Sequence, residues 1–325
     1  MQFSGQIPTD RVTMGAELIG TAAIGDFARA LEAAAFDAGY VTEHPFPPDS
    51  WLRAGGHHAL DPFVALAVAA SATQRLRLHT NILVLPYRNP FLTAKAVASL
   101  DAVSGGRVIL GVAAGYLEAE YRALGADFAH RNELADDALL AMKRAWSGAS
   151  VQWDGPGYQA VGNTMLPGPV QKPHPPIWVG GNSRRAVRRA ARHGQGWSPF
   201  PVKAASGRHT RTAPLESIDE LAVRIRELGD HARELGRSEP LDVNFVPFGL
   251  AMDPTRTPDP DAFCEQVVRL AEVGVSWLSV GLPCPSRAAY CEHAARFGEQ
   301  VIARIRSSAS ACDPLAGGVS GACGP

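Results

Sequence analysis

The amino-acid sequence predicts an α/β fold, a closed (β/α)8 or TIM barrel, on three observations. A short apolar, β-rich run is followed by a helical pattern about eight times along the 325 residues. Eight strand–helix units in one chain favour a closed parallel barrel over an open sheet. The main alternative is an open doubly wound sheet, and its Gly-x-Gly-x-x-Gly fingerprint between strand and helix is absent from the sequence.

Each element is predicted from its own residues. The strands are expected at 2–7, 39–43, 76–85, 107–112, 176–180, 195–198, 241–248 and 275–281. The helices are expected at 24–37, 61–73, 90–103, 132–147, 183–192, 217–235, 261–273 and 286–306. Leu221, Ile225 and Leu228 recur on one face of a helix. Asp61-Pro62 is typical of a helix start, and Gly274 follows a helix as C-terminal stops do.

Three segments do not fit the repeat. Residues 148–175 and 199–216 are rich in Pro and Gly, and we expect them to be inserted loops over the C-terminal face of the barrel. Residues 308–325 are rich in Gly, Ala and Ser and are predicted to form a disordered tail. A single domain over 1–307 follows.

The composition excludes several classes of protein. A formal net charge of -1 argues against a general binder of nucleic acid or membrane surfaces, which normally carries a basic excess. The first residues lack the basic region and apolar run of a signal peptide, so a cytoplasmic location is expected. The five cysteines form no Cys-x-x-Cys pair, which argues against structural zinc.

A histidine stands at the end of the second predicted strand. In a barrel the loops after the strands form the active-site face, and His44 lies there before Trp51 in a segment rich in proline and aromatic residues. An imidazole suits proton transfer at neutral pH, which favours a catalytic role for His44. The alternative is a purely structural histidine that caps the strand. His57 follows in the same loop and could supply a second polar contact. The spacing matches no helix-borne metal site, so no metal is expected.

The third and fourth strands also end in unusual residues. Asn81, inside an apolar strand, requires a hydrogen-bond partner, which a ligand or the backbone could supply; a bulge or a layer-filling polar side chain is an equal alternative. Small residues up to Gly115 would let a flat ligand approach the backbone, with Tyr116 beside it. Packing inside the barrel would explain the same small residues.

The fifth strand leads into Gly180-Gly181-Asn182-Ser183 and then a helix. Unpaired backbone N–H groups at a helix start, together with the positive end of the helix dipole, bind anions. Barrel enzymes often hold phosphate on their later loops. This turn is therefore predicted to bind a phosphate group.

Taken together, these segments resemble the luciferase-like monooxygenase superfamily, and most of all its coenzyme F420-dependent oxidoreductase branch. The segments that carry the resemblance are Thr42-Glu43-His44, Asn81 to Pro86, Ser104 to Gly115, and Pro175 to Ser183. The similarity extends to about residue 305. Each motif is weak alone, and their combination is specific.

The resemblance implies a bacterial-luciferase-like barrel, usually dimeric, that binds a flavin or deazaflavin at the strand C-terminal face. It implies a non-prolyl cis peptide at Asn81-Ile82 behind the cofactor ring, and it places His44 near the reactive ring. It assigns the phosphate to Gly180–Ser183. It also brings Gly115 and Tyr116 to the cofactor.

The resemblance favours F420 over FMN. True bacterial luciferases have an arginine for the FMN phosphate where this sequence has Ala114, and the F420 branch usually has a small residue there. Glu43 stands where several F420 enzymes have aspartate, which keeps the charge. The expected function is hydride transfer between F420 and a small organic substrate, with His44 handling the proton and Glu43 orienting it. Trp51, His57 and Tyr87, along with Tyr116, would line the substrate pocket.

Three alternatives stay open. An FMN-dependent monooxygenase would need oxygen and a partner reductase to supply reduced flavin. A flavin- or deazaflavin-binding carrier would catalyse nothing. A sugar-phosphate barrel enzyme would need a lysine or paired carboxylates at the strand ends, and the sequence offers neither.

Overall fold

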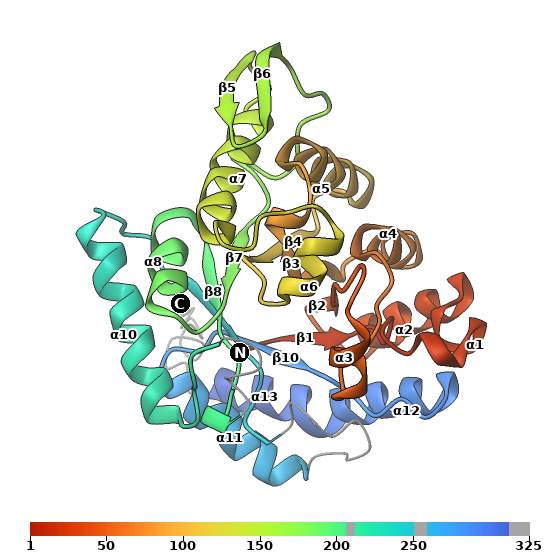
Figure 1. Ribbon diagram of the computed structural model, residues 1–325. Helices are drawn as coiled ribbons and strands as arrows, with labels where there is room; N and C mark the ends of the chain where they lie inside the picture. The colour runs from red at the N-terminus through yellow and green to blue at the C-terminus, as the bar shows by residue number, and fades with distance from the viewer. Residues whose placement is uncertain (206–211, 250–258, 312–325) are drawn as a thin grey trace, which may run out of the picture.

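Eight parallel strands close into a barrel in the computed structural model, which describes residues 1–205, 212–249 and 259–311 (Figure 1). The order around the barrel is β1-β10-β9-β8-β7-β4-β3-β2. The strands are β1 Gln2–Gln6, β2 Ala38–Val41, β3 Arg77–Val84, β4 Val108–Ala113, β7 Ile177–Gly180, β8 Gly196–Ser198, β9 Asp242–Phe245 and β10 Trp277–Val280. Every predicted strand is present, so the predicted barrel is confirmed and the open sheet is excluded.

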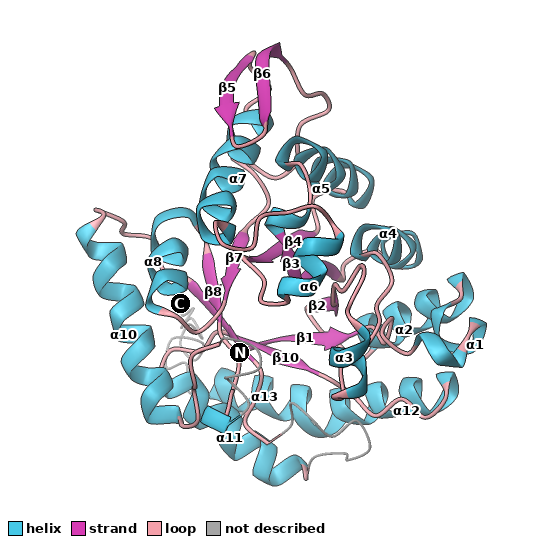
Figure 2. Ribbon diagram, viewed as in Figure 1, coloured by secondary structure: helices cyan, strands magenta, loops and turns pink. Residues whose placement is uncertain are grey.

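Helices surround the barrel (Figure 2). They are α1 Ala16–Ile19, α2 Thr21–Ala33, α3 Asp49–Arg53, α4 Pro62–Ala72, α5 Pro90–Ser104, α6 Glu118–Ala123, α7 Arg131–Trp146, α8 Arg184–His193, α10 Ile218–Glu234, α11 Pro260–Glu272, α12 Arg287–Phe297 and α13 Ala303–Ala311. Short turns of helix are η1 Val12–Met14, η2 Leu85–Tyr87 and the π-helical η3 Gly298–Ile302. Of the helices in the described ranges, none is long and apolar enough to cross a membrane.

Capping side chains fix where helices begin. The carboxylate of Asp61 accepts hydrogen bonds from the backbone N–H groups of Phe63 and Val64 (2.9 and 3.1 Å), with proline at the first position of α4, as predicted. At the other end of the chain, the helix predicted over 286–306 is α12 and α13 joined by η3, and it continues through residues 308–311. The remainder of the predicted tail, 312–325, lies outside the described residues.

The barrel interior is packed with side chains at its centre. Ala38, Ile109, Trp178 and Trp277 form a buried cluster separate from the core between strands and helices. The two indole rings meet edge to face at 5.0 Å. Gly196 on β8 pairs with Trp178 on β7 and leaves room for the Trp178 indole, because a Cβ at position 196 would lie 2.4 Å from that ring. The centre of the barrel is therefore filled, and any ligand must bind above it.

The two insertions lie at opposite ends of the barrel. Residues 148–175 run from the end of α7 to the start of β7, and Gln171 there bonds to Asp101 at the end of α5 and to Val108 at the start of β4. Contrary to the sequence-based expectation, this insertion is at the amino-terminal face, because a helix-to-strand connection returns to where the next strand begins. It carries the antiparallel hairpin of β5 Val151–Gly155 and β6 Tyr158–Asn163, which projects from the barrel (Figure 1).

The insertion at 199–216 does follow the end of a strand. It begins after Ser198, the last residue of β8, and so lies at the C-terminal face as expected. Residues 206–211 of this insertion lie outside the described residues.

A buried glycine gives a direct test of the packing. A Cβ at Gly111 on β4 would lie 2.1 Å from the carbonyl oxygen of Thr80 on β3, so Gly111→Ala should destabilise the fold by about 1–3 kcal/mol through overpacking. The matched control is Gly229→Ala on α10, where nothing lies within 4 Å. That change should stabilise by up to about 1 kcal/mol, since alanine favours helix. Denaturant unfolding measures both, and equal effects would contradict the packing at Gly111.

Candidate active site

A histidine and a carboxylate meet at the mouth of the barrel. His44 follows β2, and its imidazole Nδ1 lies 3.4 Å from Oε2 of Glu120 on α6, the helix after β4. The side chain of His44 is 11% exposed and that of Glu120 is 0% exposed. A solvent-reachable imidazole is thus backed by a fully buried acid.

Three donors converge on Glu120. Besides His44, the backbone N–H of Phe46 donates to Oε1 (2.9 Å) and the hydroxyl of Tyr87 donates to Oε2 (2.8 Å). Burial alone would raise the pKa of Glu120, but the hydrogen bonds from His44, Phe46 and Tyr87 outweigh it and hold the pKa below its usual value. Because a carboxylate only accepts, the proton of neutral His44 sits on Nδ1 and Nε2 keeps its lone pair.

Glu43 does not have the expected role of orienting His44. Its carboxylate accepts from the backbone N–H of Val84 (2.6 Å) and from the guanidinium of Arg88. Burial raises the pKa of Glu43, and Arg88 and Val84 oppose that shift. Glu43 therefore joins the end of β2 to the end of β3, and Glu120 is the carboxylate that orients His44. Glu120 is not among the predicted site residues, because its only sequence signal is a glutamate shortly after the fourth strand.

Aromatic rings surround His44 as the sequence predicts. Trp51 on α3 lies 4.3 Å from the imidazole, ring centroid to ring centroid, and His57 lies 5.0 Å away at an interplanar angle of 84°. Tyr116, in the connection after β4, lies 6.3 Å from the imidazole, ring centroid to ring centroid. Tyr87 faces Glu120 with its hydroxyl and packs its ring on Tyr121 at 4.8 Å, so it supports the carboxylate from behind.

The third strand carries a backbone irregularity inside the barrel. The Asn81-Ile82 peptide bond is cis, as the family resemblance implies, and the register between β3 and β4 shifts at this point. The amide of Asn81 donates to Ser279 on β10 (3.4 Å). The partner of the Asn81 amide is a side-chain hydroxyl, neither the ligand nor the backbone group that was expected, and the bulge and the polar interior side chain of the alternative interpretation are both present.

A row of polar side chains crosses the barrel above the tryptophan layer. From Asn81 it continues through Ser279, whose hydroxyl donates to Asn244 (3.0 Å), to Ser198, which accepts from Asn244 (2.8 Å). Ile82 lies beside this row and fills the space over Gly180, where a Cβ would be 2.2 Å from its Cδ1. Together they form the floor of the mouth.

The turn at 180–183 offers backbone donors at a helix start. The hydroxyl of Ser183 accepts from the N–H of Ala186 (3.2 Å) and caps α8. The N–H groups of the first turn before Ala186 have no acceptor within the helix. Ser183 is exposed, and Gly181 has a φ of 110°, which glycine adopts without strain. The geometry fits an anion.

The side chain of Asn182 is already engaged. Its amide nitrogen donates to the carbonyl oxygens of Phe200 (2.8 Å) and Ala213 (2.9 Å), and its oxygen accepts from the N–H of Phe200 (3.1 Å). Asn182 therefore fastens the 199–216 insertion to this turn, and only its backbone is available to a ligand.

The end of β4 is accessible and small. Ala113, Ala114 and Gly115 are half-buried, and the hydroxyl of Tyr121 donates to the carbonyl of Ala114. Gly115 has a φ of 68°, and a Cβ there would lie 2.6 Å from Val84. The small residues leave this backbone open to a flat ring, and the approach of such a ring stays a prediction.

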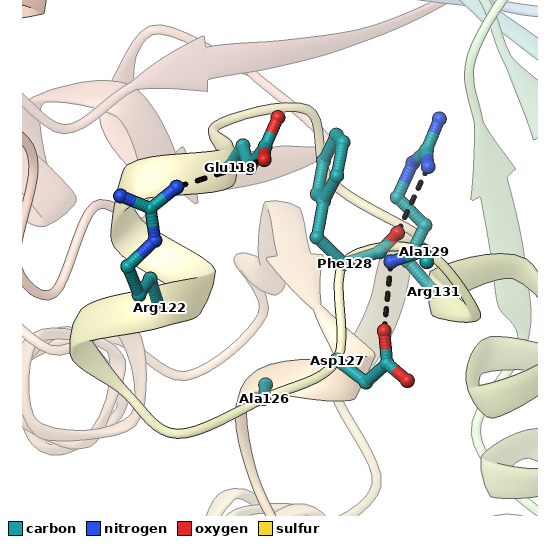
Figure 3. A pocket seen from close by; sticks show the side chains of 7 residues that line it. All are labelled: Glu118, Arg122, Ala126, Asp127, Phe128, Ala129 and Arg131. Carbon is teal, nitrogen blue, oxygen red and sulfur yellow. Dashed lines mark hydrogen bonds and ion pairs between the residues drawn. The ribbon is translucent and has the colours of Figure 1, made fainter.

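Two surface grooves flank α6 without including His44. One, of about 510 Å³, lies between α6 and the start of α7, where Arg131 packs on Phe128 (Figure 3). The other, of about 500 Å³, lies beside the proline-rich segment that follows His44. Among the side chains of the described ranges, no group of three His, Cys, Asp or Glu could hold a metal ion.

Comparison with known proteins gives a consistent result. Residues 1–251 match the family described as luciferase-like monooxygenase. The chain is 27% identical over 316 residues to an F420-dependent glucose-6-phosphate dehydrogenase of Beutenbergia cavernae, covering 85% of this chain and 91% of that protein. It is 34% identical over 125 residues to an FMNH2-dependent dimethylsulfone monooxygenase of Pseudomonas putida, covering 38% of this chain and 34% of that protein.

A solved structure confirms the fold. The monooxygenase RslO1 of Streptomyces bottropensis superposes with a TM-score of 0.75 at 19% identity, over 94% of this chain and 99% of that chain.

The buried carboxylate makes stability depend on pH. The pKa of Glu120 in the folded protein lies below its usual value, so its contribution is present above about pH 4.5 and is lost as the pH falls through the folded pKa. Glu120→Gln should cost about 1.5–3 kcal/mol at pH 7, because charge-assisted hydrogen bonds are lost. The deficit should shrink as the pH drops from 5 to 3.

The control for this prediction is Glu118→Gln on the same helix. Glu118 is exposed and pairs with Arg122 at 3.7 Å, an ion pair of little worth. Its effect should stay within about 0.5 kcal/mol at every pH. Thermal unfolding across the pH range measures both variants, and a pH-independent deficit for Glu120→Gln would refute the anionic carboxylate.

Proposed function

This chain belongs to the luciferase-like monooxygenase family, and we propose that it is an oxidoreductase that transfers a hydride between coenzyme F420 and a small organic substrate. The observation that carries the proposal is the His44–Glu120 pair, set among aromatic rings at the barrel mouth beside the small end of β4. An imidazole fixed in this way suits the proton that accompanies hydride transfer to or from an oxygen.

The residues present fit a deazaflavin. The first-turn N–H groups of α8 and the exposed Ser183 would hold its phosphate, and Asn81-Ile82 and Gly115 would lie against its ring, with Tyr116 at the edge. When bound, F420 supplies the hydride acceptor or donor. Ala114 offers no guanidinium to an FMN phosphate. The F420-dependent relative also aligns over 85% of this chain, against 38% for the FMNH2-dependent one.

The chain's own residues would manage the proton. Nε2 of His44 takes the proton from a substrate hydroxyl in the oxidative direction and returns it to a carbonyl oxygen in the reductive direction. Glu120 stabilises the imidazolium, because its buried charge lies 3.4 Å from Nδ1. Trp51, His57 and Tyr116 exclude water around the imidazole.

A specific observation also supports a second candidate, an FMN-dependent monooxygenase that takes reduced flavin from a partner reductase and consumes oxygen. The Pseudomonas putida relative of that kind is 34% identical over the region it shares with this chain.

A titration with the two cofactors distinguishes these functions. Oxidised F420 and FMN are added separately to the purified protein while cofactor and tryptophan fluorescence are followed. We expect F420 to bind with micromolar or tighter affinity and FMN weakly. Tight FMN binding without F420 binding would favour the monooxygenase, and binding of neither would refute the phosphate site at α8.

The same titration, together with an anaerobic turnover assay, isolates the role of His44. His44→Ala should leave F420 binding unchanged, while anaerobic turnover falls about 10²–10⁴-fold, the usual share of general acid–base catalysis. Undiminished turnover would remove His44 from the mechanism.

We also propose that the protein is a homodimer that buries the outer faces of α4 and α5. These helices pack on each other and carry the exposed apolar side chains Val64 (64%), Leu92 (70%) and Val103 (74%). Exposed apolar side chains gathered on one surface usually mark a site of protein–protein contact.

The cytoplasmic location and the lack of nucleic-acid or membrane partners stay predictions from the sequence.

Light scattering tests the dimer. The wild-type mass should be twice the 34.5 kDa of one chain, and the double variant Leu92→Glu, Val103→Glu should have the mass of one chain. The control is Val161→Glu on β6, equally exposed at 69% but on the projecting hairpin, which should stay dimeric. A wild-type protein of monomer mass would overturn the proposal.

A further inference from the structure

Arg88 lies at the barrel mouth, and the proposed mechanism does not use it. Its Nη1 donates to the carboxylate of Glu43, and its Nη2 lies 3.5 Å from Oδ2 of Asp61 at the start of α4. The guanidinium also lies over the ring of Phe63, 5.8 Å from the centroid. The side chain of Arg88 is 23% exposed and that of Glu43 is 2% exposed. A partly exposed cation thus reaches the buried acid that precedes His44 in the chain.

The backbone on both sides of Arg88 is held by local structure. Arg88 follows η2, and its N–H donates to the carbonyl oxygen of Leu85 (3.4 Å). Asn89, the next residue, accepts from the N–H groups of Phe91 (2.9 Å) and Leu92 (3.4 Å) and caps α5. The Arg88 side chain therefore starts from a backbone position that is hydrogen-bonded before it and after it.

Two pairs of neighbouring residues are joined twice at the mouth. Glu43 and His44 follow each other after β2, and Tyr87 and Arg88 follow each other after β3. The first link is the ion pair between Arg88 and Glu43. The second link is Oε2 of Glu120, which lies 3.4 Å from Nδ1 of His44 and 2.8 Å from the hydroxyl of Tyr87. These contacts form a closed ring, so a change at the ion pair shifts His44 relative to Glu120.

We propose that Arg88 is a positioning residue that holds the imidazole of His44 against Glu120 through its ion pair with Glu43. Arg88 acts through Glu43 and is not itself a catalytic residue. The expected effect on turnover rests on the proposed function, whereas the position of His44 can be measured without it.

The burial of Glu43 makes this ion pair consequential. Burial raises the pKa of Glu43, and the charge of Arg88 and the N–H of Val84 oppose that shift. Without the guanidinium, the carboxylate takes up a proton or moves toward water, because an unpaired buried charge is costly. Either change frees the end of β2 from Arg88, and His44 moves with it.

The first test uses nitrogen NMR to determine the tautomer of His44 in the protein without cofactor, at about pH 8, where an ordinary imidazole is neutral. His44→Gln assigns the signals. In the wild type the proton should lie on Nδ1, because Nδ1 donates to Glu120. In Arg88→Gln the imidazole should leave Glu120, and the Nδ1–H form should fall by at least half in favour of the Nε2–H form.

The matched control is Arg122→Gln on α6, the helix that carries Glu120. Arg122 is exposed and pairs with Glu118 at the surface (Figure 3). Its loss removes the same charge without touching Glu43, so the tautomer of His44 should be that of the wild type.

A second variant separates positioning from folding. Glu43→Gln, Arg88→Met removes both charges together, keeps an acceptor for the N–H of Val84 and breaks the link between the two connections. Because it buries no unpaired charge, it should fold, which near-UV circular dichroism checks. It should show the same change of tautomer as Arg88→Gln.

The second test is turnover. In the F420-loaded enzyme, Arg88→Gln should lower kcat about 10–100-fold with KM little changed, because a small misplacement of a catalytic group costs about that much. Arg88→Lys should recover part of this loss, since lysine keeps a charge beside Glu43 but not the fork that also reaches Asp61. Arg122→Gln should match the wild type.

The two tests separate the possible failures. If the double variant folds and His44 keeps its proton on Nδ1, the proposal is overturned, whatever the turnover. If the wild type turns over and Arg88→Gln retains its kcat, the proposal is overturned while the proposed function stands. If the wild type shows no turnover with F420, the proposed function fails, and the tautomer alone decides whether Arg88 positions His44.

Discussion

The arrangement of the mouth depends on one buried anion. Glu120 sits on the connection after β4, its donors Phe46 and His44 on the connection after β2, and Tyr87 after β3. A carboxylate removed from water must keep its donors, because each lost hydrogen bond leaves a charge uncompensated. The connections after β2, β3 and β4 are therefore fixed relative to one another here, and the imidazole takes its orientation from them.

The barrel separates stability from chemistry along its axis. Its centre is filled by Trp178 and Trp277, and there the buried His79, beside Arg77, has its pKa lowered to about 3 and stays uncharged. The polar row from Asn81 to Ser198 begins only above this layer. Dispersion and burial thus hold the lower layers together, while the upper layer can carry polar groups that a ligand could use.

Local sequence signals predicted the strands and the position of His44, because periodicity and strand ends depend on neighbouring residues. They could not distinguish Glu43 from Glu120, since both are glutamates after strands and the partner of His44 is 76 positions away. The face of the barrel on which the hairpin lies could have been predicted from the sequence. Residues 148–175 follow a helix and precede a strand, and that direction of the chain, rather than their Pro and Gly content, decides at which end of a barrel they lie.

Asn182 couples two parts of the molecule that could otherwise change independently. One amide side chain holds the insertion at Phe200 and at Ala213, and the same residue forms the turn before α8. A loop transplanted from another member of the family would seat correctly only if it presented its backbone at both points. A change of this insertion, by evolution or by loop exchange, therefore requires a matching change of Asn182. Such a change also alters the turn that is proposed to hold the cofactor.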